Sequence, residues 1–150
     1  MQSLNFPEYT FKIRETEKNP QIFDPFRRKY VALTPEEWVR QHLVHYLIHE
    51  KGVPRSLISV EKSIRVNRLA KRMDAVVFSR QGTPLMLIEC KAPSVQVSQA
   101  TFDQAARYNL SLNVNYLLIS NGIEHFCCRM DHAGKKYEFL QGIPDYDALQ

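Results

Sequence analysis

The chain has 150 residues, of which 44% are hydrophobic and 24% are charged, a balance typical of a soluble globular domain. No apolar run of about 18 residues occurs, so we predict neither a membrane-spanning segment nor a membrane partner. The start of the chain lacks a basic stretch followed by an apolar one, which makes the cytoplasm the expected location. Three cysteines, two of them adjacent at Cys127 and Cys128, argue against a disulfide framework.

Basic residues cluster in the middle of the chain, although the formal net charge of the sequence is +4. Between residues 62 and 91, seven basic residues surround two acidic ones, Asp74 and Glu89. The seven are Lys62, Arg65, Arg68, Lys71, Arg72, Arg80 and Lys91. A positive surface around a small acidic centre suits a polyphosphate backbone, which indicates a nucleic-acid partner. Arg68 and Arg80 also fit the ordinary role of charged residues that protect strand edges from aggregation.

The first part of the chain is predicted to be an arm followed by a helix. Residues 1–33 mix aromatic and charged residues with prolines, and we expect an N-terminal arm with two short strands, around 9–14 and 22–23. A helix then starts at Thr34, which suits the N-cap, with Pro35 at the first helical position and Glu37 completing a capping box. Gly52 is expected to end this helix, and Trp38 is expected to anchor it in the core.

The remaining residues, 34–150, are predicted to form one α/β domain without internal repeats. Strands are expected over residues 57–66, 72–79 and 84–91, a second helix over 98–113, and further strands over 115–120, 123–129 and 137–140. The second helix then connects two parallel strands, as crossover helices do. We therefore expect a central mixed β-sheet flanked by helices.

The two strands on either side of Gln81-Gly82 are predicted to form a β-hairpin. A two-residue turn places Arg80 opposite Thr83, and a four-residue loop places Ser79 opposite Pro84. Both registers pair positions whose numbers sum to 163.

This register brings acidic and basic residues together at one end of the hairpin. Asp74 is expected opposite Glu89, and because side chains alternate along a strand, Lys91 shares their face while Cys90 points away. Two neighbouring carboxylates repel each other unless a proton or a cation joins them. Mg²⁺ suits such a pair, since it takes oxygen ligands and needs one or two carboxylates. The simpler alternative is a surface salt-bridge cluster in which Lys91 joins both acids.

Three histidines on the first helix raise the alternative of a zinc site. His42, His45 and His49 follow one another at spacings of three and four residues, which places imidazoles on one side of a helix. The segment lacks the glutamate of a His-Glu-x-x-His protease, and the sequence has no Cys-x-x-Cys and no obvious third ligand. We therefore do not predict zinc here.

Several short motifs follow one another in an order that resembles a known family. They are Thr34-Pro-Glu-Glu-Trp-Val-Arg-Gln41, Arg72-Met-Asp74, Ile88-Glu-Cys-Lys-Ala-Pro93, Gln104-Ala-Ala-Arg-Tyr108 and Ser120-Asn-Gly122. Together they resemble the PD-(D/E)xK nuclease superfamily, and more closely the N-terminal nuclease domain of type I restriction enzyme R subunits, over about residues 22–130. Met73 stands where the superfamily's name has proline. The resemblance implies a restriction-endonuclease-like core.

The resemblance also implies roles for individual residues. Asp74 and Glu89, with the backbone carbonyl of Cys90, would bind Mg²⁺, for which Mn²⁺ can substitute. Lys91 would assist the attacking water. Glu37 matches an acidic residue that supports the metal or a bound water in many members of the superfamily.

Glu37 and the second helix carry alternatives of their own. A capping role at the helix start competes with the catalytic role of Glu37, and Glu36 is its nearest rival. The resemblance of the Gln-x-x-x-Tyr motif implies contacts with DNA near the active site, and the alternative is an ordinary helix flank with a half-buried Tyr108. The residues expected to bind the substrate are Gln104, Tyr108, Arg72 and Arg107.

We expect a Mg²⁺-dependent deoxyribonuclease that hydrolyses phosphodiesters by attack of a metal-activated water. No phosphate-binding loop of the Gly-x-x-x-x-Gly-Lys-[Ser/Thr] type occurs, so a stand-alone relative of the R-subunit nuclease domain is expected rather than the translocating motor. Helicase or methyltransferase partners fit this setting, and double-strand cleavage would favour a homodimer or a transient pair. The alternatives are a catalytically silent nucleic-acid-binding or assembly module with the same fold, and a phosphatase-like or unrelated metal site.

Overall fold

The computed structural model describes residues 1–66 and 69–150. Its strands are β1 (Ile13–Arg14), β2 (Gln21–Asp24), β3 (Lys29–Ala32), β4 (Ile58–Val66), β5 (Leu69–Phe78), β6 (Pro84–Cys90), β7 (Tyr116–Ser120), β8 (His125–Asp131) and β9 (Lys136–Phe139). Its helices are α1 (Pro35–Lys51), α2 (Gln99–Leu112) and two short 3-10 helices, Arg55–Leu57 and Tyr146–Leu149. No helix in this part of the chain is long and apolar enough to cross a membrane.

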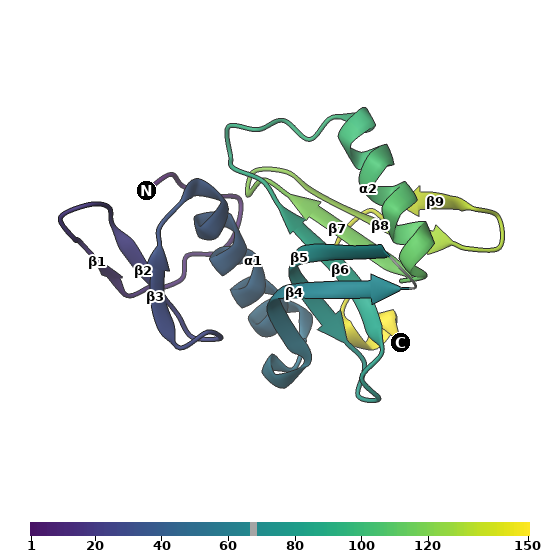
Figure 1. Ribbon diagram of the computed structural model, residues 1–150, viewed down its shortest axis with the longest axis horizontal. Coiled ribbons are helices and arrows are strands. Elements are labelled where there is room, and N and C mark those ends of the chain that lie inside the picture. The colour runs from purple at the N-terminus through teal and green to yellow at the C-terminus, as the bar shows by residue number, and fades with distance from the viewer. Residues whose placement is uncertain (67–68) are drawn as a thin grey trace.

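The strands form two sheets, with α1 between them (Figure 1). The larger sheet has the strand order β4-β5-β6-β7-β8-β9. Its strands β6 and β7 are parallel, and its other neighbouring strands are antiparallel. Helix α1 covers one face of this sheet and α2 the other. The predicted α/β architecture, with a central mixed sheet flanked by helices, is therefore confirmed.

Helix α1 begins and ends where its sequence signals predict. The Thr34 hydroxyl accepts a hydrogen bond from the Glu37 amide at 3.1 Å, and Pro35 occupies the first turn. At the other end Gly52 has a φ of 69°, in the left-handed region that favours glycine, and its amide donates to the Leu47 carbonyl. Local hydrogen bonds therefore fix both ends of the helix.

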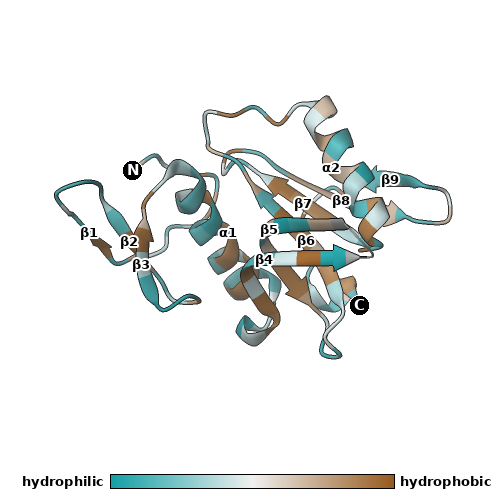
Figure 2. Cartoon of the chain, in the orientation of Figure 1, coloured by the Kyte–Doolittle hydropathy of each residue, from teal (hydrophilic) through white to brown (hydrophobic). Residues whose placement is uncertain are grey.

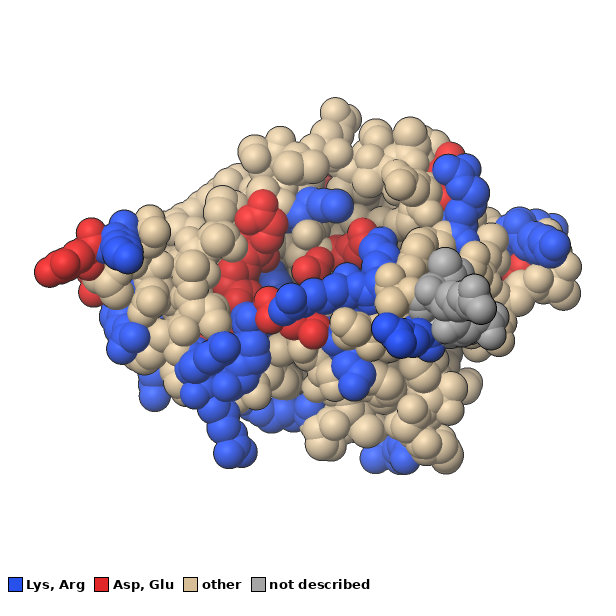
Figure 3. Space-filling model, viewed as in Figure 1, with Lys and Arg blue, Asp and Glu red and all other residues tan. Residues whose placement is uncertain are grey.

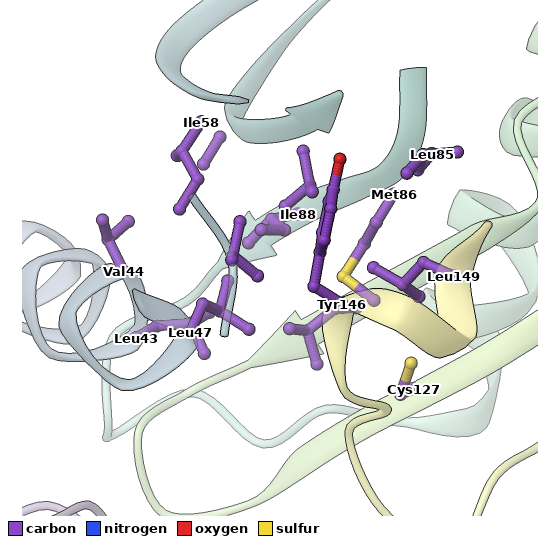
Figure 4. Close-up of a cluster of buried hydrophobic side chains, with 14 of the residues drawn as sticks. Leu43, Val44, Leu47, Ile58, Leu85, Met86, Ile88, Cys127, Tyr146 and Leu149 are labelled. Carbon is purple, nitrogen blue, oxygen red and sulfur yellow. The ribbon is translucent and has the colours of Figure 1, made fainter. Parts of the chain in front are cut away.

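A hydrophobic cluster joins α1 to the larger sheet (Figure 4). Val39, Leu43 and Leu47 lie on one side of the helix at helical spacing and are almost fully buried. Tyr146 closes the cluster from the C-terminal 3-10 helix, and its hydroxyl donates to the Phe78 carbonyl at 2.9 Å. Figure 2 shows apolar residues concentrated in the central strands and on the inner side of α1. Each buried leucine contributes about 2 kcal/mol, so α1 is held firmly against β5 and β6.

Helix α2 packs on the opposite face and carries the crossover from β6 to β7. The Ser98 hydroxyl accepts a hydrogen bond from the Thr101 amide at 3.2 Å, and Asn113 ends the helix with a φ of 59°. Phe102 and Ala106 are buried against the sheet. The predicted helix and its parallel crossover are confirmed.

The β5–β6 hairpin follows the predicted register along the strands but not at the turn. The pairs from Ala75 with Ile88 to Val77 with Met86 have the expected sum of 163. An irregularity after Val77 then places Phe78 opposite Pro84, so both predicted turn pairings are wrong. The loop instead closes through a hydrogen bond from the Thr83 amide to the Ser79 hydroxyl at 3.0 Å.

The N-terminal arm is more ordered than its sequence predicts. It contains a three-stranded antiparallel sheet, β1-β2-β3, whose third strand was not predicted. Lys29–Ala32 is too short to show a clear alternation, and pairing with β2 defines it as a strand. Trp38 is half-buried and holds the arm, since its indole donates to the Gln2 carbonyl at 2.8 Å. The prediction that Trp38 is a core anchor is wrong.

The α1 histidines face aromatic rings of the arm. Tyr9 lies 5.9 Å from His49 between ring centroids, and Phe11 lies 4.8 Å from His42. The Nδ1 atoms of His42 and His45 hydrogen bond to backbone carbonyls of the same helix. These contacts give the histidines a role in docking the arm.

Candidate active site

The side chains of β5 do not alternate regularly around Asp74. Met73 is buried in the cluster beneath α2, whereas Ala75 is buried in the cluster beneath α1. Residues two apart share a face in a regular strand, so the alternation is broken between them. On β4, Val60 pairs with Ala75 and Lys62 with Met73. Glu61, between them, has a φ of 51°. The pairs between β5 and β6 end at Ala75 with Ile88, and the two strands separate beyond that point.

Asp74 lies at the separation and bonds directly to the next strand. Its Oδ2 accepts a hydrogen bond from the Cys90 amide at 2.6 Å, where the strand ladder has ended. Burial raises the pKa of the Asp74 carboxyl; the Cys90 amide opposes this rise, and the nearby Glu89 carboxylate adds to it. A carboxylate in this environment gains from a nearby cation.

Glu89 and Lys91 line a hollow of about 320 Å³ between the sheet and α2. Gln104 and Tyr108 line the same hollow from the helix. Cys90 points to the other side, where it is buried beneath α1. The predicted alternation of Glu89, Cys90 and Lys91 is therefore confirmed, and the Gln-x-x-x-Tyr motif lies beside them.

Lys71 is a member of this hollow that sequence reasoning missed. Its ammonium forms an ion pair with the Glu89 carboxylate and lies 5.1 Å from the centroid of the Tyr108 ring. Lys71 and Asp74 are three positions apart, so a regular strand places their side chains on opposite faces. Because Asp74 was expected on the face of Glu89, Lys71 was expected on the other face. Within the part of the chain that the structure describes, Lys91 has no ion pair, so the alternative in which Lys91 joins both acids is not observed.

Glu37 lines a second hollow, of about 260 Å³, together with Asp74, Glu36 and Glu61. Its carboxylate is buried and forms ion pairs with Arg27 and Arg40 rather than folding back over the helix start. The capping-box prediction is thus half right, because the Glu37 amide takes part and its carboxylate does not. Asp74 lines this hollow and not the one that contains Glu89, and the β5–β6 pairs end before it. The prediction that Asp74 lies opposite Glu89, on the face of Glu89 and Lys91, is therefore wrong, because the strands separate there and the alternation of β5 is broken.

The arm and α1 meet through a buried network of charges around Arg40. Arg40 is bonded to Glu37 at 2.5 Å and to Asp24 of β2 at 3.0 Å. Arg27 pairs with both of these acids and also with Glu61 at 2.8 Å. Burial acts to raise the pKa of Asp24, but the hydrogen bond from Arg27 and the charge of Arg40 outweigh it and hold that pKa below its ordinary value. No pattern in the sequence links these distant residues.

The network reaches the candidate site through electrostatics. The charge of Arg40 lowers the pKa of Asp74 and so opposes the effect of burial. Figure 3 shows one group of acidic side chains near the middle of a face, with basic side chains between and around them. This arrangement agrees with the predicted acidic centre in a basic surface.

The remaining predicted substrate-binding residues lie farther out. Arg72 is exposed and bonded to Glu61 at 2.6 Å. Arg107 is exposed on α2 and lines neither hollow. Arg68, counted among the basic residues above, lies outside the described residues.

Two side chains near the strand separation could supply ligands to a hard divalent cation. Asp74 and Glu89 supply carboxylate oxygens, which Mg²⁺ prefers, and Mg²⁺ needs one or two carboxylates from the protein. The Lys71 ammonium pairs with the Glu89 carboxylate and supplies the positive charge next to it. Among residues 1–66 and 69–150, no group of three or more His, Cys, Asp or Glu residues is arranged to hold a metal, so water and substrate oxygens would complete the coordination.

Comparisons with known proteins give this geometry a context. A family model described as the N terminus of the type I restriction enzyme R protein matches residues 35–144. A solved fragment of a candidate HsdR subunit of a type I restriction enzyme from Vibrio vulnificus YJ016 is 21% identical, with a TM-score of 0.56 over 78% of this chain. The chain spans 24% of the length of that fragment. A candidate nuclease of the DUF820 group from Anabaena variabilis ATCC 29413 is 14% identical, with a TM-score of 0.49 over 86% of this chain and 80% of that chain. No curated protein matches the sequence.

The family match covers most of the chain, including α1, the β5–β6 hairpin, α2 and β7. The Vibrio fragment shares the fold. The restriction-endonuclease-like core expected from the sequence is therefore confirmed. The chain belongs to the family of type I restriction enzyme R protein N termini.

Proposed function

We propose that this chain is a metal-dependent nuclease domain that hydrolyses phosphodiester bonds of DNA. The observation that carries the proposal is the position of Asp74, Glu89 and Lys91 where β5 and β6 separate, with Gln104 and Tyr108 of α2 beside Glu89 and Lys91. Membership of a restriction-enzyme family supports DNA as the substrate.

Each side chain at the separation has a distinct proposed role. Asp74 and Glu89, with the Cys90 carbonyl, would hold Mg²⁺ or Mn²⁺. When bound, the cation supplies positive charge for the phosphate oxygens and lowers the pKa of a water molecule. Lys91 shares the hollow with Glu89 and has its ammonium available to orient the attacking water and to offset charge on the phosphate.

We assign Glu37 a positioning role. Its buried carboxylate holds Arg40, and Arg40 lowers the pKa of Asp74, which favours the ionised form that a ligand requires. Because Glu37 is already paired with two arginines, it acts through them rather than as a direct metal ligand. Asp24 completes the same network from the arm.

The DNA contacts are expected to be mostly with phosphates. Gln104 and Tyr108 lie beside Glu89 and Lys91, and Arg72 is an exposed basic residue of β5. No recognition element for bases is evident, so we propose little intrinsic sequence preference. The family suggests that the domain works with helicase or methyltransferase components of a type I restriction system, and a cut in both strands would require two copies.

Nicking of supercoiled plasmid DNA with Mg²⁺ or Mn²⁺ tests the proposal. We expect the wild-type protein to nick, and Asp74→Asn and Lys91→Met to lose at least about 100-fold in rate. Lys136→Met, on the exposed strand β9, serves as a matched control that removes a positive charge far from the site and keeps its activity. Binding of a short duplex, measured for every variant, separates loss of chemistry from loss of affinity.

Two results would count against the proposal. Nicking that survives both Asp74→Asn and a chelator would place the chemistry elsewhere. A wild-type protein that binds DNA but never cuts with either metal would favour the silent binding or assembly module. A crystal soaked in Mn²⁺ gives independent evidence, because an anomalous peak between Asp74 and Glu89 is expected.

A further inference from the structure

We propose that Lys71 is a built-in counter-cation that a divalent metal must displace from Glu89, and that its ammonium then binds a phosphate of the substrate. This inference rests on the proposed function, because it concerns the same metal ligands. It assigns a role to a residue outside the Asp74, Glu89 and Lys91 motif. It also predicts that the wild-type site binds metal more weakly than its two carboxylates alone would allow.

The first observation is the pairing of a nearly buried acid with a more exposed base. The Glu89 side chain is 12% exposed and the Lys71 side chain 33%, and the two form an ion pair. A buried carboxylate without a partner is costly, so Glu89 needs a positive charge in the absence of metal. Lys71 supplies that charge, although Lys91 lies closer to Glu89 in sequence and lines the same hollow.

The second observation is the aromatic ring beside the ammonium. The Lys71 Nζ lies 5.1 Å from the centroid of the Tyr108 ring, within the range of a cation–π interaction. Lysine carries its charge on a flexible four-carbon stem, so Nζ can leave Glu89 without movement of the backbone. Tyr108 would keep the released ammonium in the hollow that it shares with Gln104 and Lys91, where the substrate phosphate is proposed to enter.

The break in strand alternation makes this placement specific to the fold. Lys71 reaches the α2 side because β5 changes side at Asp74, between Met73 and Ala75. A regular strand would instead present Lys71 to the same side as Ala75, beneath α1. The irregularity of β5 at Asp74 therefore also places the Lys71 ammonium beside Glu89.

The affinity for Mn²⁺ in the absence of DNA tests the first half of the proposal, the displacement of Lys71 by the metal. It can be measured by titration calorimetry or by the loss of the free-ion electron paramagnetic resonance signal. We expect Lys71→Met to bind Mn²⁺ about tenfold more tightly than wild type, because competition for a partly buried charge pair is removed. Lys91→Met is the matched control: it removes the same charge from the same hollow but breaks no ion pair, and we expect a change of less than about threefold. Lys71→Arg restores the competing charge and should return the affinity toward the wild-type value.

The outcomes separate this inference from the proposed function. If Asp74→Asn abolishes Mn²⁺ binding while Lys71→Met binds like wild type, the metal site stands and the counter-cation is refuted. Equal tightening by Lys71→Met and Lys91→Met would also refute it, since a general change of field would then suffice. If neither wild type nor any variant binds Mn²⁺, the inference and the proposed function both fail.

The second half is tested by DNA affinity with Ca²⁺, a cation of the same charge that we use to occupy the site. Lys71→Met should then bind a short duplex about three- to tenfold more weakly, and the dependence of affinity on salt should fall by about one phosphate contact. Unchanged DNA affinity and salt dependence would show that the displaced ammonium does not bind phosphate.

Discussion

Replacement of Arg40 by methionine gives the sharpest test of how the arm and α1 are joined. The Arg40 guanidinium bonds to Glu37 at 2.5 Å and to Asp24 at 3.0 Å, and all three side chains are buried. Methionine retains much of the apolar stem of arginine but leaves both carboxylates with Arg27 as their shared partner. The variant therefore isolates the charge of Arg40 from its packing.

The expected loss follows from the burial of the two acids. Breaking a buried ion pair by removing one partner costs about 3–5 kcal/mol. Arg27 still neutralises part of the charge, so we expect the lower end, about 3 kcal/mol, for Arg40→Met. For a chain of this length that corresponds to a fall in Tm of about 6–12 °C.

Urea unfolding at neutral pH measures this loss, and Arg129→Met is the control. The Arg129 guanidinium pairs with Glu138, but the two side chains are 56% and 58% exposed. We therefore expect Arg129→Met to change the free energy of unfolding by no more than about 0.5 kcal/mol. A loss in Arg40→Met as small as that of the control would refute the buried network as a source of stability.

Acid unfolding gives a second readout of the same network. The pKa of Asp24 is lowered in the folded protein, so its contribution is complete above its ordinary value of 3.8 and is lost as the pH falls through the lowered value. Arg40→Met removes one cause of the lowering. The stability of the variant should therefore fall less steeply below pH 3.8 than that of wild type, and parallel curves would contradict this assignment.

Three further changes are predicted from the structure. Gly122→Ala should lower the free energy of unfolding in urea by about 2–4 kcal/mol, because the φ of Gly122 is 87° and an added Cβ would approach a leucine of the arm to 2.8 Å. The control Gly82→Ala, at a φ of 86° with open space around it, should cost about 1–2 kcal/mol. Equal losses in the two variants would exclude the contact with the leucine. Tyr146→Phe should lose about 1 kcal/mol by removing the hydrogen bond to the carbonyl of β5, and an unchanged urea midpoint would contradict that bond. Burial lowers the pKa values of His42 and His45, so the unfolded chain binds more protons than the folded protein at mildly acidic pH. The free energy of unfolding should therefore fall as the pH drops below about 6.5. A urea midpoint that stays constant down to about pH 5.5 would exclude this linkage.

The arm illustrates how far local sequence signals reach. Two short strands were expected there, but the third strand and the docking of the arm on α1 were not. The aromatic and histidine side chains that join the arm to the helix are more than 25 residues apart in the sequence, and no periodicity connects them. The predicted core position of Trp38 failed for the same reason, because the partner that it meets is the arm.

The sequence by itself determined the features that depend on neighbouring residues. Hydrogen bonds within one turn fixed the ends of both helices at Thr34, Gly52, Ser98 and Asn113. Strand alternation placed Glu89 and Lys91, which directly follows β6, on the same side of the sheet. The family motifs lie on these local elements, which is why they were readable.

Tertiary structure decided what surrounds those motifs. The change of side in β5, the arrival of Lys71 at Glu89 and the pairing of Arg40 with Asp24 depend on contacts between distant segments. A strand obeys its alternation only while its neighbours pair with it regularly, and the separation of β5 from β6 removes that constraint at Asp74. Buried charges likewise select their partners by proximity in the folded chain, which no local pattern encodes.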